Sequence, residues 1–255
     1  MPHSLDQFLL GLFLAAAVSL AAFRARALTG SGALAAWAVG AVVFGAGGLV
    51  TSAALLMFFV TSSALSRWRK GAKEALGYEK GGRRDWAQVL ANGGVAAACL
   101  LLPFLLPGFT HARLLCLAAL AAANADTWAT EIGSALGGRP FDLRTGRAAA
   151  PGASGAISVA GTLAALAGAA LLGLFAGEAS GWGIVTLSGL GGALLDSLLG
   201  ATLQAQWRDS ARPGLWTERP QAGPPDRGWR RMGNDAVNAL CTLGAVGLAA
   251  TLKII

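Results

Sequence analysis

Hydrophobic residues form long, nearly continuous runs along this chain, and short polar stretches separate the runs. Each run has about 17–25 residues, the length at which an α-helix crosses the hydrocarbon core of a bilayer. The pattern predicts an all-α polytopic membrane helix bundle that forms a single domain over residues 1–255. The eight expected transmembrane helices cover residues 5–23, 29–46, 48–66, 86–106, 112–136, 152–176, 183–203 and 234–253. Only the GAGG stretch at 45–48 separates the second helix from the third.

Composition supports a membrane protein. Of the 255 residues, 55% are hydrophobic and 13% are charged, and the mean hydropathy is +0.57. Soluble domains carry about 25% charged residues. The net charge of +7 does not indicate a nucleic-acid partner, because the basic residues stand between the apolar runs without a recognisable RNA- or DNA-binding motif. Cys99, Cys116 and Cys241 lie inside apolar runs, so we expect buried thiols rather than a disulfide framework.

The basic residues predict an orientation. All of the 20 Lys and Arg except Arg113 and Lys253 fall in alternate loops, at 24–28, 67–85, 137–151 and 204–233. Loops rich in Lys and Arg stay on the cytoplasmic side of a membrane. We therefore expect both termini outside, in a bacterial-type plasma membrane.

The two halves of the chain, 1–106 and 112–253, resemble each other weakly. SGALAAWAVGA at 31–41 resembles SGAISVAGTLA at 154–164, and two further pairs follow in the same order. One interpretation is a tandem 4+4 repeat whose halves are related by an axis along the membrane normal. The alternative is chance similarity among helices rich in Ala and Gly.

Polar side chains are expected at one depth below the cytoplasmic face. Four carboxylates lie inside the helices, namely Asp126, Glu131, Asp196 and Asp235. Asp196 is about two turns, ~10 Å, from the inner end of its helix. Amide and hydroxyl groups fall near the same level at Asn92, Asn124, Thr127, Ser154, Ser158, Asn234 and Asn238. Intramembrane ionisable residues are functional by default, so the pattern predicts one site facing the cytoplasm.

Structural explanations exist for several of these features. The small-residue stripe that runs from Gly189 to Gln204 is more often used for helix packing than for ligands. Asp85 and Asp142 can pair with neighbouring Arg. The acids of the Pro-rich loop are expected to be solvated, and they are Asp209, Glu218 and Asp226. A buried ion pair is the alternative for the intramembrane acids, but no Lys or Arg lies within their spans.

Divalent metal and phosphate chemistry suits this set of groups. Clustered carboxylates repel one another unless a cation joins them, and Mg²⁺ takes one or two carboxylates together with phosphate oxygens. The GASG stretch at 152–155 could offer backbone N–H groups to an anion, and Lys80, Arg83 and Arg84 could hold nucleotide phosphates. Both His residues are expected on the outer side, so a His-based hydrolase or a zinc site is not indicated.

Five motifs carry a resemblance to a known family. They are KGGRRDWAQVLANGG (80–94), ANADTWATEIG (123–133), GASGAIS (152–158), LLDSLLGATLQ (194–204) and GNDAVN (233–238). In these motifs the chain resembles an uncharacterised-domain membrane family that includes plant phytyl-phosphate kinases and animal transmembrane protein 19. More distantly, residues 126–133 resemble the D-x-x-A-x-x-x-G element of dolichol and phytol kinases.

The resemblance implies phosphoryl transfer from CTP to an isoprenoid monophosphate with Mg²⁺, giving the diphosphate. It places metal, directly or through water, at Asp126, Glu131, Asp196 and Asp235. Supporting roles fall to Asn92, Thr127, Ser154, Asn234 and Asn238, and Arg83 and Arg84 meet phosphate. The expected partners are an isoprenoid monophosphate lipid, a nucleotide and membrane lipids. A transporter or flippase for a polyprenyl phosphate or similar anion is the alternative, and a scaffold is a third.

Overall fold

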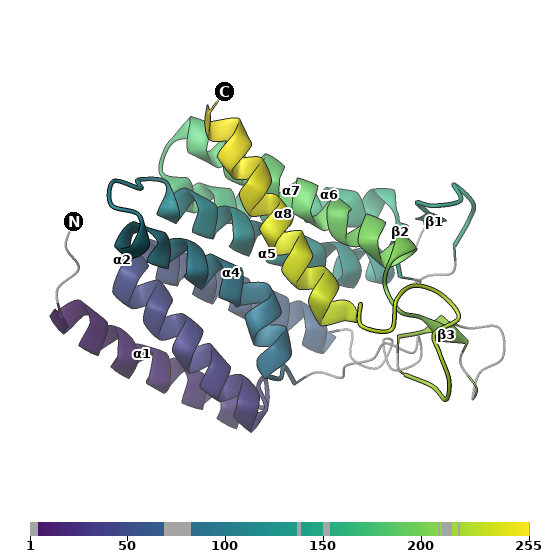
Figure 1. Cartoon of the computed structure of the whole chain (residues 1–255), viewed down its shortest axis with the longest axis horizontal. Coiled ribbons are helices and arrows are strands. Elements are labelled where there is room, and N and C mark those ends of the chain that lie inside the picture. The colour runs from purple at the N-terminus through teal and green to yellow at the C-terminus, as the bar shows by residue number, and fades with distance from the viewer. Residues whose placement is uncertain are drawn as a thin grey trace.

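The structure is a bundle of long helices, which confirms the expected all-α membrane fold (Figure 1). This computed structural model describes residues 5–68, 83–136, 139–149, 154–208, 210, 216–218 and 220–254. In these ranges the α-helices are α1 (Leu5–Arg24), α2 (Gly30–Trp68), α4 (Trp86–Leu105), α5 (Ala112–Leu136), α6 (Val159–Gly173), α7 (Ala179–Thr202) and α8 (Asn234–Ile254). A 3₁₀ turn, η1 (Leu174–Ala176), follows α6.

Six of these helices are long and apolar enough to cross a membrane, and α5 is the exception because polar residues fill its second half. The expected total of eight crossings stays a prediction, as does the 4+4 repeat. Two small antiparallel hairpins join the helices. They pair β1 (Phe141–Asp142) with β2 (Ala156–Ile157), and β3 (Trp207–Arg208) with β4 (Trp216–Thr217).

Helix α2 reverses direction at Gly48. A straight helix of its 39 residues would be ~58 Å long. Yet the backbone oxygen of Arg84 accepts from the Thr29 amide at 2.9 Å, and the Arg84 guanidinium donates to Ser63 Oγ at 2.7 Å. One residue therefore touches both ends of α2, so its two halves run antiparallel. The bend falls at the predicted boundary between two spans at 45–48.

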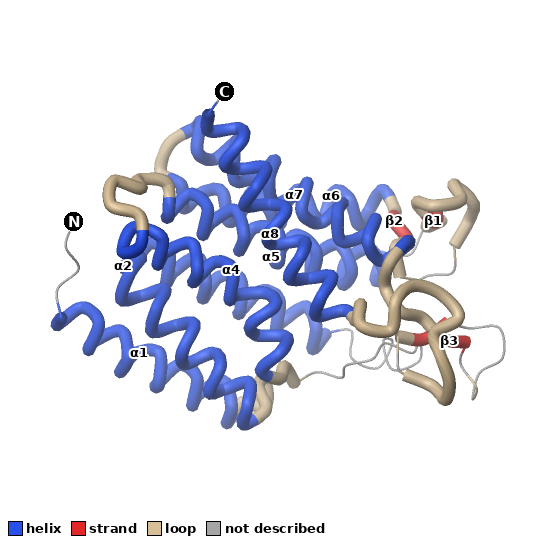
Figure 2. Tube along the Cα trace, viewed as in Figure 1, coloured by secondary structure: helices blue, strands red, loops and turns tan. Residues whose placement is uncertain are grey.

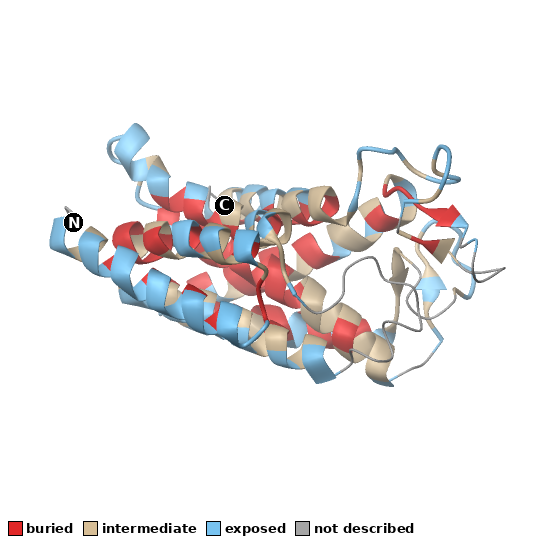
Figure 3. Cartoon of the chain, turned by 90° about the horizontal axis from the view of Figure 1, so that it is seen from below, coloured by how far each residue is buried: buried red, intermediate tan, exposed pale blue. Residues whose placement is uncertain are grey.

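Helix α5 runs through the centre of the bundle. Residues 115–125 are all buried, each with 5% exposure or less. Eleven consecutive residues make about three turns, so protein covers every face of this part of α5. Helices α2, α4, α6, α7 and α8 pack around it, whereas α1 packs along α2 on the outside. Figure 3 shows the buried residues gathered on the inner helices and the exposed ones on the outer surfaces.

Glycines allow α7 to approach α5 closely. A Cβ atom at Gly189 would lie 2.7 Å from the Cβ of Ala121, and one at Gly192 would lie 2.6 Å from the Cβ of Ala122. Neither position has room for a side chain. This part of the small-residue stripe thus serves helix packing, as membrane helix interfaces commonly require.

The described parts of the predicted basic loops lie together at one end of the bundle. The Arg67 guanidinium donates to the Ala25 carbonyl at 2.6 Å, and Ser154 Oγ donates to Gln204 Oε1 at 2.9 Å. The start of α1 and the end of α8 lie toward the other end (Figure 2).

One predicted boundary is wrong. Helix α6 begins at Val159 rather than at residue 152, because Ala156 and Ile157 pair with β1 as strand β2 and Ser158 adopts an extended backbone that caps the helix. The three cysteines are buried, as expected.

The bend in α2 gives a testable prediction. Gly48 has φ 77° and ψ −162°, a region that essentially only glycine occupies at low cost. We expect Gly48→Ala to lower the free energy of unfolding by about 1–3 kcal/mol. Gly94 is the matched control, because it lies within α4 and a Cβ there would make only ordinary contacts. Thermal unfolding in detergent measures both variants, and a Gly48→Ala protein as stable as the parent would contradict the bend.

Candidate functional site

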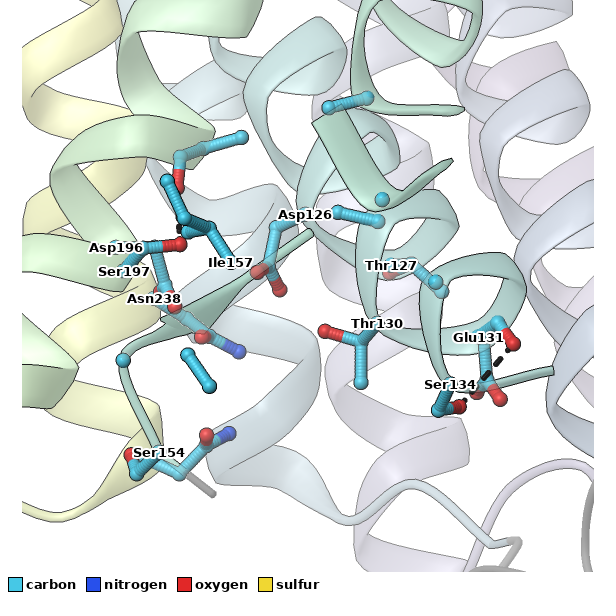
Figure 4. A pocket seen from close by; sticks show the side chains of 18 of the residues that line it. Asp126, Thr127, Thr130, Glu131, Ser134, Ser154, Ile157, Asp196, Ser197 and Asn238 are labelled. Carbon is cyan, nitrogen blue, oxygen red and sulfur yellow. Dashed lines mark hydrogen bonds between the residues drawn. The ribbon is translucent and has the colours of Figure 1, made fainter. Parts of the chain in front are cut away.

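A polar cavity of about 270 Å³ lies among the helices at the end that carries the basic loops. Residues from α2, α4, α5, α6, α7 and α8 and from their loops line it (Figure 4). Its polar lining consists of Ser66, Arg84, Gln88, Asn92, Asp126, Thr127, Thr130, Glu131, Ser134, Ser154, Ser158, Thr162, Asp196, Ser197, Gln204, Glu218, Asn234 and Asn238. Ten of the fourteen residues expected from the sequence are in this set, so the structure brings most of them together around one cavity.

Asp126 of α5 and Asp196 of α7 form the acidic centre of the cavity. Their carboxyl groups lie within hydrogen-bonding reach of each other, and Figure 4 shows both pointing into the same space. Two carboxylates at this separation repel each other unless a shared proton or a cation lies between them. Glu218, from the loop between β4 and α8, adds a third negative charge near Asp196. This Glu218 was expected to be solvated, and its place in the cavity corrects that expectation.

Helix α8 orients Asp196. The Asn238 side chain, turned so that its nitrogen faces α7, donates to Asp196 Oδ1 at 3.1 Å and to the Asn234 carbonyl at 3.3 Å. Asn238 and Asn234 are one helical turn apart, so they share a face of α8. Asp235 lies beside them in the first turn, but it is not among the residues that line the cavity.

Glu131 lines another part of the cavity. It is buried, and its Oε1 accepts a hydrogen bond from Ser66 Oγ of α2 at 2.6 Å. The Arg84 guanidinium is its cationic neighbour. No Lys or Arg lies within the spans, but Arg84, from the segment before α4, is close enough to act on Glu131 electrostatically. In the part of the chain that the structure describes, no three His, Cys, Asp or Glu side chains gather closely enough to hold one ion. The four expected metal ligands therefore separate into the pair Asp126 and Asp196, and two residues elsewhere.

Arg84 is the basic residue of the cavity. Its backbone is fixed by hydrogen bonds to Ala27 and Thr29, and its side chain donates to Ser63 Oγ. Burial lowers the pKa of the guanidinium to about 10, an effect that Glu131 opposes and Arg67 reinforces. Arg84 consequently remains a cation at neutral pH. It can provide a positive charge for a phosphate inside a largely apolar protein.

Arg83 lies in a different environment from Arg84. Its guanidinium donates to the Leu28 carbonyl at 3.2 and 2.9 Å and lies 5.8 Å from the centre of the Phe23 ring. It is exposed and outside the cavity lining. Of the two arginines expected to meet phosphate, only Arg84 is placed to do so. Lys80 lies outside the described residues.

The segment before α6 forms one wall of the cavity. Gly155 has φ 77°, and a Cβ atom there would lie 2.3 Å from the Ala201 amide nitrogen, so only glycine fits against α7. Ser158 Oγ accepts from the Gly161 amide at 3.1 Å and caps α6. The GASG stretch at 152–155 was expected to offer backbone amides to an anion; residues 152 and 153 lie outside the described residues, so this stays a prediction. Ser154 and Ser158 line the cavity.

Asn124 serves the fold rather than the cavity. It is fully buried, its Oδ1 accepts from Thr61 and Ser62 of α2, and its Nδ2 donates to the Gly168 carbonyl of α6 at 2.8 Å. It thus joins three helices.

Asp85 and Asp142 accept backbone amides, Asp85 as the cap of α4 and Asp142 in a turn. Their expected pairing with neighbouring arginines stays a prediction.

Sequence reasoning missed several lining residues. Gln204 is 3% exposed, and its Nε2 donates to no acceptor among the described residues. Gln88 likewise buries an Oε1 that meets no donor there. Gln204 ends the stripe that contains Asp196, so its periodicity was a usable signal. Ser66 had none, because its contact with Glu131 depends on the reversal of α2.

A family model described as integral membrane protein DUF92 matches residues 13–246. The chain therefore belongs to this family of integral membrane proteins, which confirms the resemblance seen in the five motifs at the level of the family.

Three similar proteins illustrate the range of the family. Protein PGR of Arabidopsis thaliana is 32% identical over 220 residues, which are 73% of this chain and 76% of that protein. An uncharacterized membrane protein of Synechocystis sp. is 33% identical over 181 residues, with 68% and 70% covered. Another from Methanocaldococcus jannaschii is 33% identical over 154 residues, with 59% and 63% covered. No solved structure matches the chain significantly.

The role of Asn124 can be tested by its stability effect. We expect Asn124→Ala to lower the free energy of unfolding by about 1–3 kcal/mol, because it leaves buried partners on two helices unsatisfied. Thr127→Val is the control, since the Thr127 hydroxyl donates only to the Ala123 carbonyl of its own helix. Unfolding titrations in mixed detergent measure both. An Asn124→Ala protein of parental stability would contradict a structural role.

Proposed function

We propose that the polar cavity is the active site of a membrane-embedded, nucleotide-dependent kinase. Its acceptor would be an isoprenoid monophosphate, such as a prenyl or phytyl phosphate, and its product the diphosphate. The observation that carries the proposal is the pair Asp126 and Asp196, held within hydrogen-bonding reach inside a polar cavity of an otherwise apolar bundle. Such a pair is costly in a membrane protein and is typically retained for function.

The donors around the pair suit phosphate groups. Arg84 supplies a cation, and the Nε2 of Gln204 is a buried donor that a phosphate oxygen would satisfy. Hydroxyl groups of Thr127, Thr130 and Ser197 also line the space. The cavity therefore combines acidic groups on one side with donors on the others, as a site for two anionic substrates requires.

The carboxylate pair also fits a divalent cation. Mg²⁺ binds through one or two carboxylates and completes its shell with water and phosphate oxygens, so Asp126 and Asp196 would hold it without a third acid. When bound, Mg²⁺ would neutralise phosphate charge between donor and acceptor. Asn238 would keep the Asp196 carboxylate oriented, as neighbouring hydrogen bonds do for metal ligands generally.

The reaction balances without a strong general base. An oxygen of the lipid monophosphate attacks the γ-phosphorus of the nucleotide, the bond from that phosphorus to the β,γ-bridging oxygen breaks, and the nucleoside diphosphate leaves. The attacking oxygen is already anionic, so Arg84 and the carboxylate-bound cation mainly reduce repulsion between two anions. CTP is the proposed donor on the strength of the family resemblance. The basic end of the bundle would face the cytoplasm and receive it.

Phosphoryl transfer tests this proposal directly. Purified protein with γ-³²P-labelled CTP, Mg²⁺ and farnesyl, geranylgeranyl or phytyl monophosphate should produce a labelled lipid diphosphate. Asp126→Asn and Asp196→Asn should each lower the rate by about 10²-fold or more, the scale on which loss of a charge-stabilising group acts. Asp6→Asn is the control, because Asp6 is exposed in the first turn of α1. Absence of labelled lipid together with lipid-phosphate transport in liposomes would favour the flippase alternative.

Metal binding provides a second test that needs no activity. Mn²⁺, used in place of Mg²⁺ and followed by electron paramagnetic resonance, should bind to the parent protein in the presence of a nonhydrolysable nucleotide. Asp126→Asn and Asp196→Asn should each weaken that binding about tenfold or more. Glu131→Gln should leave it unchanged, since Glu131 is held by Ser66 instead. Equal losses in all three variants would place Glu131 at the metal as well and contradict a site made by the pair alone.

A further inference from the structure

A second cavity, of about 340 Å³, lies between α1, α2 and α4. Its walls are mostly apolar, and small residues such as Ala15, Ala36 and Gly93 leave the space open. On the second half of α2 it extends from Leu49 to Phe59, a rise of ten residue steps or ~15 Å along a helix. Its lining residues Leu14, Val18 and Leu56 lie in the middle of their helices and are 38–42% exposed, so this apolar groove opens toward the lipid on the side of the bundle.

The groove and the polar cavity meet. Arg84, Gln88 and Asn92 line both of them. On the groove side, the Arg84 guanidinium carbon lies 5.4 Å from the centre of the Phe59 ring, and on the cavity side its neighbour is Glu131. The Gln88 side chain, with its buried Oε1 unsatisfied among the described residues, stands at the same junction. Arg84, Gln88 and Asn92 thus form the boundary between the apolar groove and the polar cavity.

We propose that this groove holds the hydrocarbon tail of a single-chain lipid monophosphate whose phosphate lies in the polar cavity. The inference rests on the proposed function for the headgroup and adds the place of the tail. Arg84 stands where tail ends and phosphate begins, with its aliphatic part on the apolar side and its charge on the polar side. A tail of about 15 Å fills the groove, and a longer one leaves it through the side opening at Leu14 and Leu56 into the bilayer.

We take a single tail as the occupant, because a diacyl lipid would bring to its phosphate a second chain that needs an apolar space of its own beside this groove. The occupant is a lipid anion rather than a bulk membrane lipid because the groove ends at the half-buried guanidinium of Arg84. That cation favours an acidic headgroup.

A binding experiment without nucleotide tests the groove. Ala36 lines it, and Ala38, two residues away on the same helix, is exposed and outside it. In purified full-length protein, Ala36→Phe should raise the Kd for farnesyl monophosphate about tenfold or more. Excluding even two methylenes from the groove loses about that much affinity. The Kd for inorganic phosphate should stay the same, and Ala38→Phe should change neither value.

Photolabelling of the parent protein adds a measurement that does not depend on a substituted chain folding. A farnesyl monophosphate analogue with a diazirine at the tail end should label peptides of α1 and α2 near Leu14 and Leu49, which both line the groove. Labelling confined to α6, α7 or α8 would overturn the proposal. So would an Ala36→Phe protein that binds farnesyl monophosphate as tightly as the parent, or equally good competition by dioleoyl phosphatidic acid.

The outcomes separate this proposal from the kinase itself. Selective loss of lipid phosphate binding in Ala36→Phe would support the groove even if no phosphoryl transfer occurs. Unchanged binding in that variant would show that the groove does not hold the tail, even if the kinase activity is present.

Discussion

The structure depends on the complete enclosure of α5. An apolar helix can face lipid at no cost, but the second half of α5 carries Asn124, Asp126 and Glu131, whose polar groups cannot. Five helices surround α5, and these three polar side chains each meet a partner on a neighbouring helix. Asn124 joins α2 and α6, Asp126 meets α7, and Glu131 accepts from Ser66 of α2. Bundle assembly and site assembly are therefore the same event.

The apolar half of α5 makes this enclosure possible. Alanines fill much of the run at 115–125, and the glycines of α7 let its backbone come close to them. Close backbone contact gives van der Waals attraction where no hydrophobic effect operates between helices in lipid. Such packing holds Asp126 and Asp196 together even though two carboxylates repel. The favourable packing of small residues thus offsets the repulsion between the two carboxylates.

Much of this arrangement could be predicted from the sequence. Spans of the right length predict the helix bundle, and the shared depth of polar groups anticipates ten of the residues that line the cavity. Periodicity could not show which face of α5 meets which helix, so Asp126 and Glu131 seemed equivalent although they serve different neighbours. Asn124 illustrates the same limit, because its hydrogen bond from Thr61 depends on which face of α2 packs against α5. The reversal at Gly48 and the late start of α6 depend on backbone conformation, which an apolar pattern does not encode.

The central claim is that Asp126 and Asp196, from separate helices, interact directly in one site. A double-mutant cycle on the free energy of unfolding, measured with divalent metals chelated, tests it most directly. The account predicts that Asp126→Asn and Asp196→Asn are coupled by about 0.5–3 kcal/mol, the range for residues in contact. It also predicts that Asp126→Asn combined with Asp6→Asn is additive. Additive effects for the Asp126 and Asp196 pair would show that the two carboxyl groups do not meet, and the proposed site would not exist.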